Sequence, residues 1–306
     1  MDRITAISER PRALIALGLA GGTWGLTLPL MALALRGVSP AWLVTLRFGS
    51  AALLLCPLAG RENVRRALRP HILAWGAFGY GAVVLLQSEA IERTSVSHAA
   101  VLGGLVPAVA VLIAATRSRR LPSTAVTVGL AGAIVGVALV AGGGGHAGFG
   151  GDGLVLIASL CSGAYIAAQP RLLAGRSPIA VTGVQMGAAS LFSLPFALLG
   201  GSTPDPHGQA LLALVALVIV GSLLPFTLYA WSQTRVPHEV ASAFLNLEAL
   251  VGGLIGIVAF HDPLGGTQAL GIALLAGGIV LVAAKAPPMP AAPRLATAGD
   301  RILAAG

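Results

Sequence analysis

Apolar residues gather in ten long runs along the chain, separated by short polar or charged segments. The runs cover residues 13–35, 40–59, 72–91, 96–116, 122–142, 153–173, 179–199, 209–231, 240–261 and 267–284. Each run has about 18 to 23 residues, enough for a helix to cross about 30 Å of hydrocarbon at a rise of about 1.5 Å per residue. The pattern therefore predicts an all-α polytopic membrane protein with ten transmembrane helices.

Composition supports the membrane prediction and excludes several other classes. Hydrophobic residues make up 56% of the chain and charged residues only 10%, whereas soluble domains carry about 25% charged residues. The net charge of +8 is not arranged as a basic stripe with interleaved aromatic residues, so no nucleic-acid partner is expected. Cys56 and Cys161 lie in separate apolar runs, which argues against a disulfide or a metal site.

Basic residues lie mainly on one side of the predicted membrane. With the N-terminus inside, the inner segments hold 16 of the 19 arginine and lysine residues. The outer segments hold Arg36 and Arg93, and Arg47 lies within the second span. Positive charge favours the cytoplasmic side, so both termini are expected there. Arginine greatly outnumbers lysine, which is typical of GC-rich bacterial genomes and points to a bacterial inner membrane.

The chain divides at a glycine-rich segment. Residues 142–153 read GGGGHAGFGGDG and formally contain a dinucleotide-binding GxGxxG pattern. That motif requires a preceding strand and a βαβ unit, which the sequence does not predict, so we interpret the segment as a flexible outer linker. The expected divisions are a cytoplasmic head, a first five-helix repeat, the linker, a second five-helix repeat and a disordered tail, at residues 1–12, 13–142, 143–152, 153–284 and 285–306.

The two halves align at a constant offset of 142 residues over about 45 positions. Residues 96–115 fall on 238–257, and GVALVA at 136–141 falls on GIVLVA at 278–283. Because five spans is an odd number, the second half must enter the membrane inverted. Inverted repeats are typical of secondary transporters that alternate access around a site at the membrane midplane.

At these residues the chain resembles the drug/metabolite transporter superfamily, in particular its EamA-type exporters, over residues 13–284. The resemblance is carried by Trp24-Gly25, Leu46-Arg47-Phe48 and Leu247-Glu248, with weaker support from Leu224-Pro225 and Tyr229. Ala249 and His261-Asp262 depart from the family pattern, in which proline and Gly-Glu stand at these places. The resemblance implies ten helices, no use of ATP, and movement of small metabolites such as amino acids or of drug-like compounds.

Glu248 is the leading candidate for a functional side chain. A carboxylate at membrane depth costs about 2.5 to 3.5 kcal/mol on insertion scales, and desolvation favours its neutral form. Glu248 could therefore exchange a proton during transport, or tie its helix to a neighbour by a hydrogen bond. Asn246 lies two residues earlier, about 200° round the helix, so the two side chains need not share a ligand.

Arg47 lies within the second span, and three readings stay open. It could hold an anionic group of a substrate, pair with Glu89 near the end of the third span, or extend towards the membrane surface.

Aromatic and uncharged polar residues complete the candidate pathway. Trp24, Tyr80 and Tyr165 each fall near the middle of a span, where they could line a cavity for an organic solute or pack in the core. Trp24 shifted by 142 residues falls next to Tyr165, so the two rings are expected to face each other. Tyr229 is assigned to the same candidate pathway, and Gln87 could hydrogen-bond a ligand or another helix.

These observations predict a secondary transporter that exports small organic metabolites, with proton coupling and no cofactor. An uptake permease or a facilitative channel is the alternative. A membrane-embedded enzyme would need a motif such as HExxH, and an ATP-driven pump would need a P-loop; the sequence contains neither. The expected partners are therefore a small-molecule substrate, protons and the lipid bilayer.

Overall fold

A computed structural model describes residues 2–94, 99, 102–119, 121–141, 149–259 and 265–285. Every regular element within these residues is a helix. Six helices are long and apolar enough to cross a membrane: Glu9–Ala34, Pro40–Ala59, Pro70–Ile91, Gly150–Leu173, Pro178–Leu199 and Gly208–Gln233. Shorter apolar helices occupy Val106–Ser118, Thr124–Leu139 and Ala269–Lys285. The described part of the chain is thus all-helical, as expected for a multi-pass membrane protein, and the count of ten spans stays a prediction.

The helices follow the predicted apolar runs closely. Their bounds are α1 Asp2–Trp24, α2 Thr27–Ala34, α3 Pro40–Ala59, α4 Arg61–Ala67, α5 Pro70–Gly76, η1 Ala77–Ala82, α6 Val83–Ile91, α8 Val106–Ser118, α9 Thr124–Ala141, α10 Phe149–Leu173, α11 Pro178–Leu199, α12 Gly208–Val218, η2 Ile219–Leu223, α13 Leu224–Gln233, α14 His238–Ala243, η3 Phe244–Asn246, α15 Leu247–Ala259 and α16 Gly266–Lys285.

Two expected boundaries differ in the structure. Helix α1 already begins at Asp2, within the segment expected to be a separate charged head, and Pro11 lies inside it. Helix α10 begins at Phe149, so residues 149–152 of the expected linker are helical. Asp152 lies in its first turn, where a carboxylate is stabilised by the helix dipole. The rest of the linker and the tail beyond Lys285 lie outside the described residues.

Several predicted spans contain a break in regular α-helix. The chain turns between α1 and α2 at Gly25 and Leu26. The third and eighth runs each contain a π-helix, η1 and η2, and the ninth contains the 3₁₀ turn η3. π-Helical turns occur frequently at functional sites. A binding site is therefore expected near these breaks.

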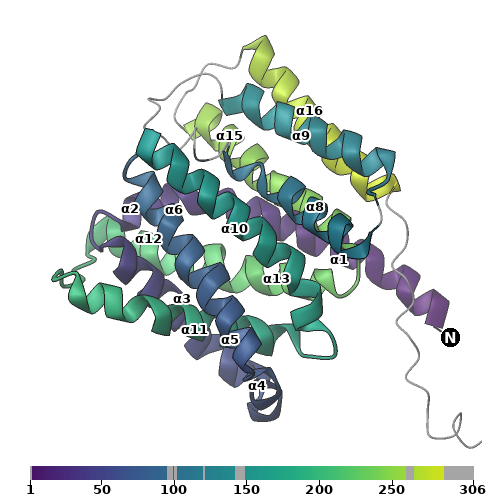
Figure 1. Cartoon of the computed structure of the whole chain (residues 1–306). Helices are drawn as coiled ribbons and strands as arrows, with labels where there is room; N and C mark the ends of the chain where they lie inside the picture. The colour runs from purple at the N-terminus through teal and green to yellow at the C-terminus, as the bar shows by residue number, and fades with distance from the viewer. Residues whose placement is uncertain are drawn as a thin grey trace, which may run out of the picture.

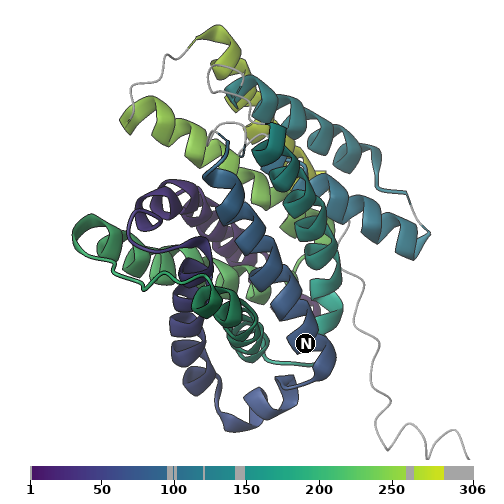
Figure 2. The ribbon, with the colours of Figure 1, turned by 60° about the vertical axis from the view of Figure 1, so that its left-hand side comes forward.

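Two helix pairs join a helix to its counterpart at the 142-residue offset. In the first pair, Ser190 of α11 donates to the carbonyl oxygen of Thr45 in α3, and further along Gly183 lies against Cys56. In the second pair, α9 and α16 lie side by side at one edge of the bundle (Figure 1; Figure 2). The short helix α4 lies at the opposite extremity of the bundle in both views. In the second pair Gly129 lies against Gly278, and Gly136 lies against Gly271. In both pairs a higher residue number in one helix meets a lower number in the other, so the partners run antiparallel.

The chain segments that connect the helices gather at two opposite ends. At one end Arg235 donates to the Glu9 carboxylate at 3.0 Å, and Arg10 donates to the carbonyl oxygen of Ala283 at 3.0 Å. At the other end the amide of Asp205 donates to the carbonyl oxygen of Gly37. Each of these contacts joins segments that the distribution of basic residues predicts to lie on the same side of the membrane.

Candidate functional site

A continuous cluster of aromatic rings fills the centre of the bundle. Tyr80 of η1 stacks on Phe48 of α3 at 5.5 Å between ring centroids and contacts Tyr165 of α10 at 5.0 Å. Phe226 of α13 contacts Tyr80 at 4.6 Å and Trp24 of α1 at 5.0 Å. Both halves of the chain contribute rings, so the cluster lies on the boundary between them.

The cluster places all four predicted aromatic residues together, but not in the expected pairs. Trp24 packs edge-on against Tyr229 and Phe226, whereas Tyr165 contacts Tyr80 and Trp75. No ring contact between Trp24 and Tyr165 occurs in the described structure, so the prediction that these two rings face each other is wrong. The reason is that Tyr80 and Phe226 lie between them.

The two π-helices begin 142 residues apart, at Ala77 and Ile219, and each contains a glycine that makes room for a side chain of the other half. A Cβ atom on Gly79 of η1 would overlap the ring of Tyr165. A Cβ atom on Gly221 of η2 would lie 3.3 Å from Nη2 of Arg47. Glycine is required where another chain segment approaches so closely, and here it lets the two halves interlock at equivalent points.

Tyr165 is held by two glutamine side chains. Its hydroxyl donates to Oε1 of Gln185 at 3.0 Å, and Nε2 of Gln169 donates to the Tyr165 oxygen. The two glutamines also exchange hydrogen bonds of 3.2 Å in both directions. All three residues are buried, and a fully satisfied buried network fixes its members in one arrangement.

Arg47 is almost fully buried, with 2% of its surface exposed. Its Nε donates to the Ser222 hydroxyl at 2.7 Å, and its Nη2 donates to the carbonyl oxygen of Gly221 at 2.7 Å. The guanidinium carbon also lies 5.0 Å from the ring centre of Phe48. Arg47 therefore links α3 directly to the π-helix η2, while Nη1 makes no hydrogen bond in the described part of the chain.

The structure contradicts two of the three roles expected for Arg47. Glu89 pairs with Arg93 at 3.0 Å on the surface and does not pair with Arg47, so that prediction is wrong. The side chain does not extend to the membrane surface either, because its polar partners lie in the interior. The expectation that Arg47 contacts a substrate stays untested.

Glu248 lies where two helix breaks meet. It occupies the first turn of α15, directly after η3, and its carbonyl oxygen would lie 3.1 Å from a Cβ atom on Gly25, between α1 and α2. Its carboxyl group interacts electrostatically with Arg47, but the two side chains form no direct ion pair in the described structure. Glu248 also makes no hydrogen bond to any described residue, which leaves its oxygens available to a proton or a ligand.

Several buried polar atoms beside these residues have no partner in the described structure. They include the Tyr229 hydroxyl, the Ser242 hydroxyl and Oδ1 of Asn246. Ser242 and Asn246 are four residues apart, so they lie on one side of the ninth run, and the Ser242 and Tyr229 hydroxyls face each other closely enough to interact weakly. Buried polar groups are almost always hydrogen-bonded in native proteins, so these three are suited to meet water or a solute.

The remaining predicted residue lies outside this arrangement. Gln87 of α6 is half-buried and makes no hydrogen bond in the described structure, so nothing connects it to the aromatic cluster.

The site also contains residues that sequence reasoning did not select. Phe48, Phe226 and Ser222 are central to the geometry. Phe48 follows Arg47 and Phe226 follows Pro225, in stretches that carry the family resemblance. Their place in these stretches could have identified both residues as candidates. Ser222 carries no such signal, because serine is common in membrane helices.

Comparisons with known proteins match this architecture. A sequence model described as the EamA-like transporter family matches residues 11–142 and again 149–284. A protein of Streptantibioticus cattleyicolor, named "Probable terminal-alkyne amino-acid exporter", is 28% identical over 277 residues, 89% of this chain and 93% of its own. An "Uncharacterized inner membrane transporter" of Salmonella typhimurium is 26% identical over 72% of this chain and 74% of its own.

A solved crystal structure shares the fold with a TM-score of 0.75 at 20% sequence identity, over 90% of this chain and 96% of the other. The family model covers both halves, and the relatives are named as transporters rather than enzymes. The protein is a membrane transporter, and the chain belongs to the EamA-like transporter family.

Proposed function

We propose that this protein is a proton-coupled secondary transporter that exports small organic metabolites, amino acids among them. Transport proceeds by alternating access between two inverted five-helix halves. The proposal assigns proton exchange to Glu248 and substrate contact to the aromatic cluster with its neighbouring polar atoms.

The observation that carries the proposal is that the Glu248 carboxyl group interacts electrostatically with the buried Arg47, while the backbone of Glu248 packs against Gly25, the residue after Trp24. The Glu248 carboxyl group and the Arg47 guanidinium group interact electrostatically in the interior, and of the two only Arg47 has hydrogen-bond partners among the described residues. Ionisable groups within a membrane span are costly and usually serve proton or substrate pathways. A fixed positive charge next to an unpaired carboxyl group suits a carrier in which that carboxyl group alternately gains and loses a proton.

Three features support an inverted repeat. Helices α3 and α11, and likewise α9 and α16, are counterparts at the 142-residue offset and run antiparallel. The π-helices η1 and η2 begin at the same offset. The turn before α8, at residues 104–105, corresponds to the break formed by η3. Breaks at equivalent depths in both halves are typical of carriers whose substrate lies near the midplane.

The surroundings of Glu248 suit a small amphipathic solute. Rings such as Trp24 and Tyr80 offer apolar faces, and the unpartnered atoms of Tyr229, Ser242 and Asn246 offer hydrogen bonds. The free Nη1 of Arg47 suits a carboxylate, which arginine binds well. The relative from Streptantibioticus cattleyicolor carries the name "Probable terminal-alkyne amino-acid exporter", and this name supports amino acids as substrates and export as the direction.

The proposed orientation has both termini in the cytoplasm of a bacterial cell, with the protein in the inner membrane. The grouping of Glu9 with Arg235 at one end and Gly37 with Asp205 at the other supports it, because the first pair lies on the side rich in arginine.

The experiment that tests the coupling is transport into proteoliposomes driven by a pH gradient, with a panel of labelled amino acids. Glu248→Gln keeps the size of the side chain but cannot ionise, so it should abolish pH-driven flux. Glu239→Gln is the matched control, because Glu239 lies in α14 at the start of the same span and should leave flux unchanged. The same pH-driven flux in Glu248→Gln as in the unmodified protein would remove Glu248 from the mechanism.

Direction and substrate are tested in cells by comparing metabolites in the medium of a deletion strain and an overexpressing strain. An exporter raises its substrate in the medium on overexpression, whereas an uptake permease depletes it. Flux that no pH gradient can drive uphill would favour the facilitative channel.

A further inference from the structure

A cavity opens at the end of the bundle that carries Ser39. It lies between the start of α3, the last turns of α6 and the end of α11, and it has a volume of about 460 Å³. Sites for drug-sized ligands commonly have volumes of about 300 to 1,000 Å³. The cavity is therefore large enough for a small organic molecule.

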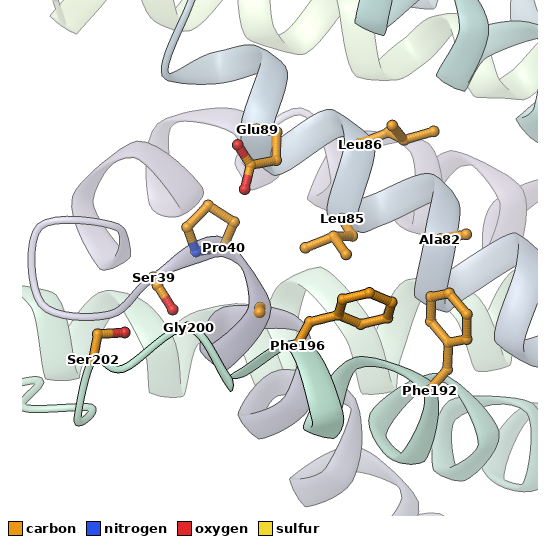
Figure 3. Close-up of a pocket in the computed structure, with 11 residues that line it drawn as sticks. Ser39, Pro40, Ala82, Leu85, Leu86, Glu89, Phe192, Phe196, Gly200 and Ser202 are labelled. Carbon is orange, nitrogen blue, oxygen red and sulfur yellow. The ribbon is translucent and has the colours of Figure 1, made fainter. Parts of the chain in front are cut away.

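The lining of this cavity is divided into a polar and an apolar side. Figure 3 shows Glu89, Ser39 and Ser202 on one side, and Leu85 with the rings of Phe192 and Phe196 on the other. The two rings form a tilted pair with 5.4 Å between their centres. The polar residues lie at or near the ends of their helices and the apolar ones further along them, so a ligand would place its polar group near the loops.

The charge at the polar side is negative. Glu89 lies in the last turn of α6 and Glu92 directly after it, and among the described residues Arg93 is the basic side chain that opposes them. The pKa of Glu92 is raised, because partial desolvation and repulsion by Glu89 outweigh the attraction of Arg93. Helix α6 ends at Ile91, and the C-terminal end of a helix adds partial negative charge. An exposed ion pair such as Glu89–Arg93 is weak, so Arg93 can give way to a ligand cation.

We infer that this cavity binds a small amphipathic amine, with its ammonium group at Glu89 and its apolar part against Phe192 and Phe196. A carboxylate supplies the counter-charge, the Ser39 and Ser202 hydroxyls accept further hydrogen bonds, and the phenyl rings receive an aromatic or alkyl group. This amine site is distinct from the proposed transport site, because Phe192 occupies the space beside Gly81 of η1 and separates the cavity from the aromatic cluster.

The test is calorimetric titration of the whole purified protein in phosphatidylcholine nanodiscs, with empty nanodiscs subtracted. The probe is 2-phenylethylamine, and 2-phenylethanol is the uncharged control of similar shape. The amine should bind more tightly than the alcohol. Glu89→Gln should weaken amine binding about two- to fivefold, the effect expected for one partly exposed ion pair, and should leave alcohol binding unchanged.

Three further variants make the outcome decisive. Phe196→Ala should weaken both probes, because it removes a ring that faces both. Glu62→Gln, in the exposed helix α4, should change neither. Glu248→Gln should also leave amine binding unchanged, which separates this inference from the proposed transport mechanism.

Several results would overturn the amine site. Equal affinities for the amine and the alcohol would remove the role of Glu89. Loss of amine binding in Glu248→Gln but not in Glu89→Gln would move the ligand to the central site. Binding that occurs in detergent but disappears in nanodiscs would assign the cavity to a lipid instead.

Discussion

At the scale of single residues, Arg47 has the most informative environment in the structure. A buried guanidinium group is costly unless its donors are satisfied, and here two donors are used by the backbone of Gly221 and the hydroxyl of Ser222. Arg47 therefore has a structural task whatever its role in transport, because it holds the first half of the chain against η2.

Replacement of Arg47 should cost stability. In Arg47→Gln, the Gly221 carbonyl and the Ser222 hydroxyl lose charged donors worth about 1.5 to 3 kcal/mol each, so the free energy of unfolding should fall by about 3 kcal/mol. The free energy of unfolding of Arg47→Lys should lie between those of the unmodified protein and Arg47→Gln, since one ammonium group cannot reproduce the planar fork of donors. Unfolding by SDS in mixed micelles measures the change.

Arg36→Gln serves as the control for this series, because Arg36 is exposed and its loss should change the stability little. Full stability of Arg47→Gln, combined with loss of transport, would contradict the structural role and leave Arg47 as a substrate contact.

At the scale of elements, close packing of α9 on α16 depends on particular glycines. A Cβ atom on Gly278 would overlap the carbonyl oxygen of Gly129, and one on Gly136 would lie 2.6 Å from the carbonyl oxygen of Gly271. Small residues let membrane helices approach closely where hydrophobic burial cannot drive them together. The contact is thus set by backbone shape rather than by apolar surface.

Gly278→Ala should push the two helices apart and destabilise the protein by about 1 to 3 kcal/mol, the usual cost of overpacking. Its neighbour provides a matched control, because a Cβ atom on Gly277 meets nothing within 4 Å. Gly277→Ala should therefore be neutral or stabilising by up to about 1 kcal/mol, since alanine favours a helix over glycine. Equal stability of the two variants in mixed micelles would show that the α9–α16 contact can relax without loss.

At the scale of the whole molecule, the proposed orientation predicts which loops face the outside. In a chain with Cys56 and Cys161 replaced by alanine, a cysteine at Ser202 should react with an impermeant thiol reagent added to intact cells. A cysteine at Glu62 should react only after the cells are opened, because α4 belongs to the opposite end of the bundle. The reverse labelling pattern would show that the protein is inserted the other way round.

The sequence by itself determined much of this protein, for identifiable physical reasons. Apolar runs long enough to cross a bilayer set the position of the helices. Unpaired backbone N–H and C=O groups are costly in hydrocarbon, and a helix pairs them within the segment. Thus α3 was expected at 40–59 and occupies Pro40–Ala59. Glu248 and Arg47 were singled out because charge is rare in such runs.

Only the tertiary structure decided which residues meet. The partners of Arg47 lie about 175 positions away in the chain. Phe226 contacts both Trp24 and Tyr80 by packing that no spacing within a helix encodes. The π-helices were also unforeseen, since an apolar run fixes where a helix lies but not how its turns are wound. The amine cavity likewise exists only where the ends of α3, α6 and α11 come together, because its carboxylate and its phenyl rings come from different helices.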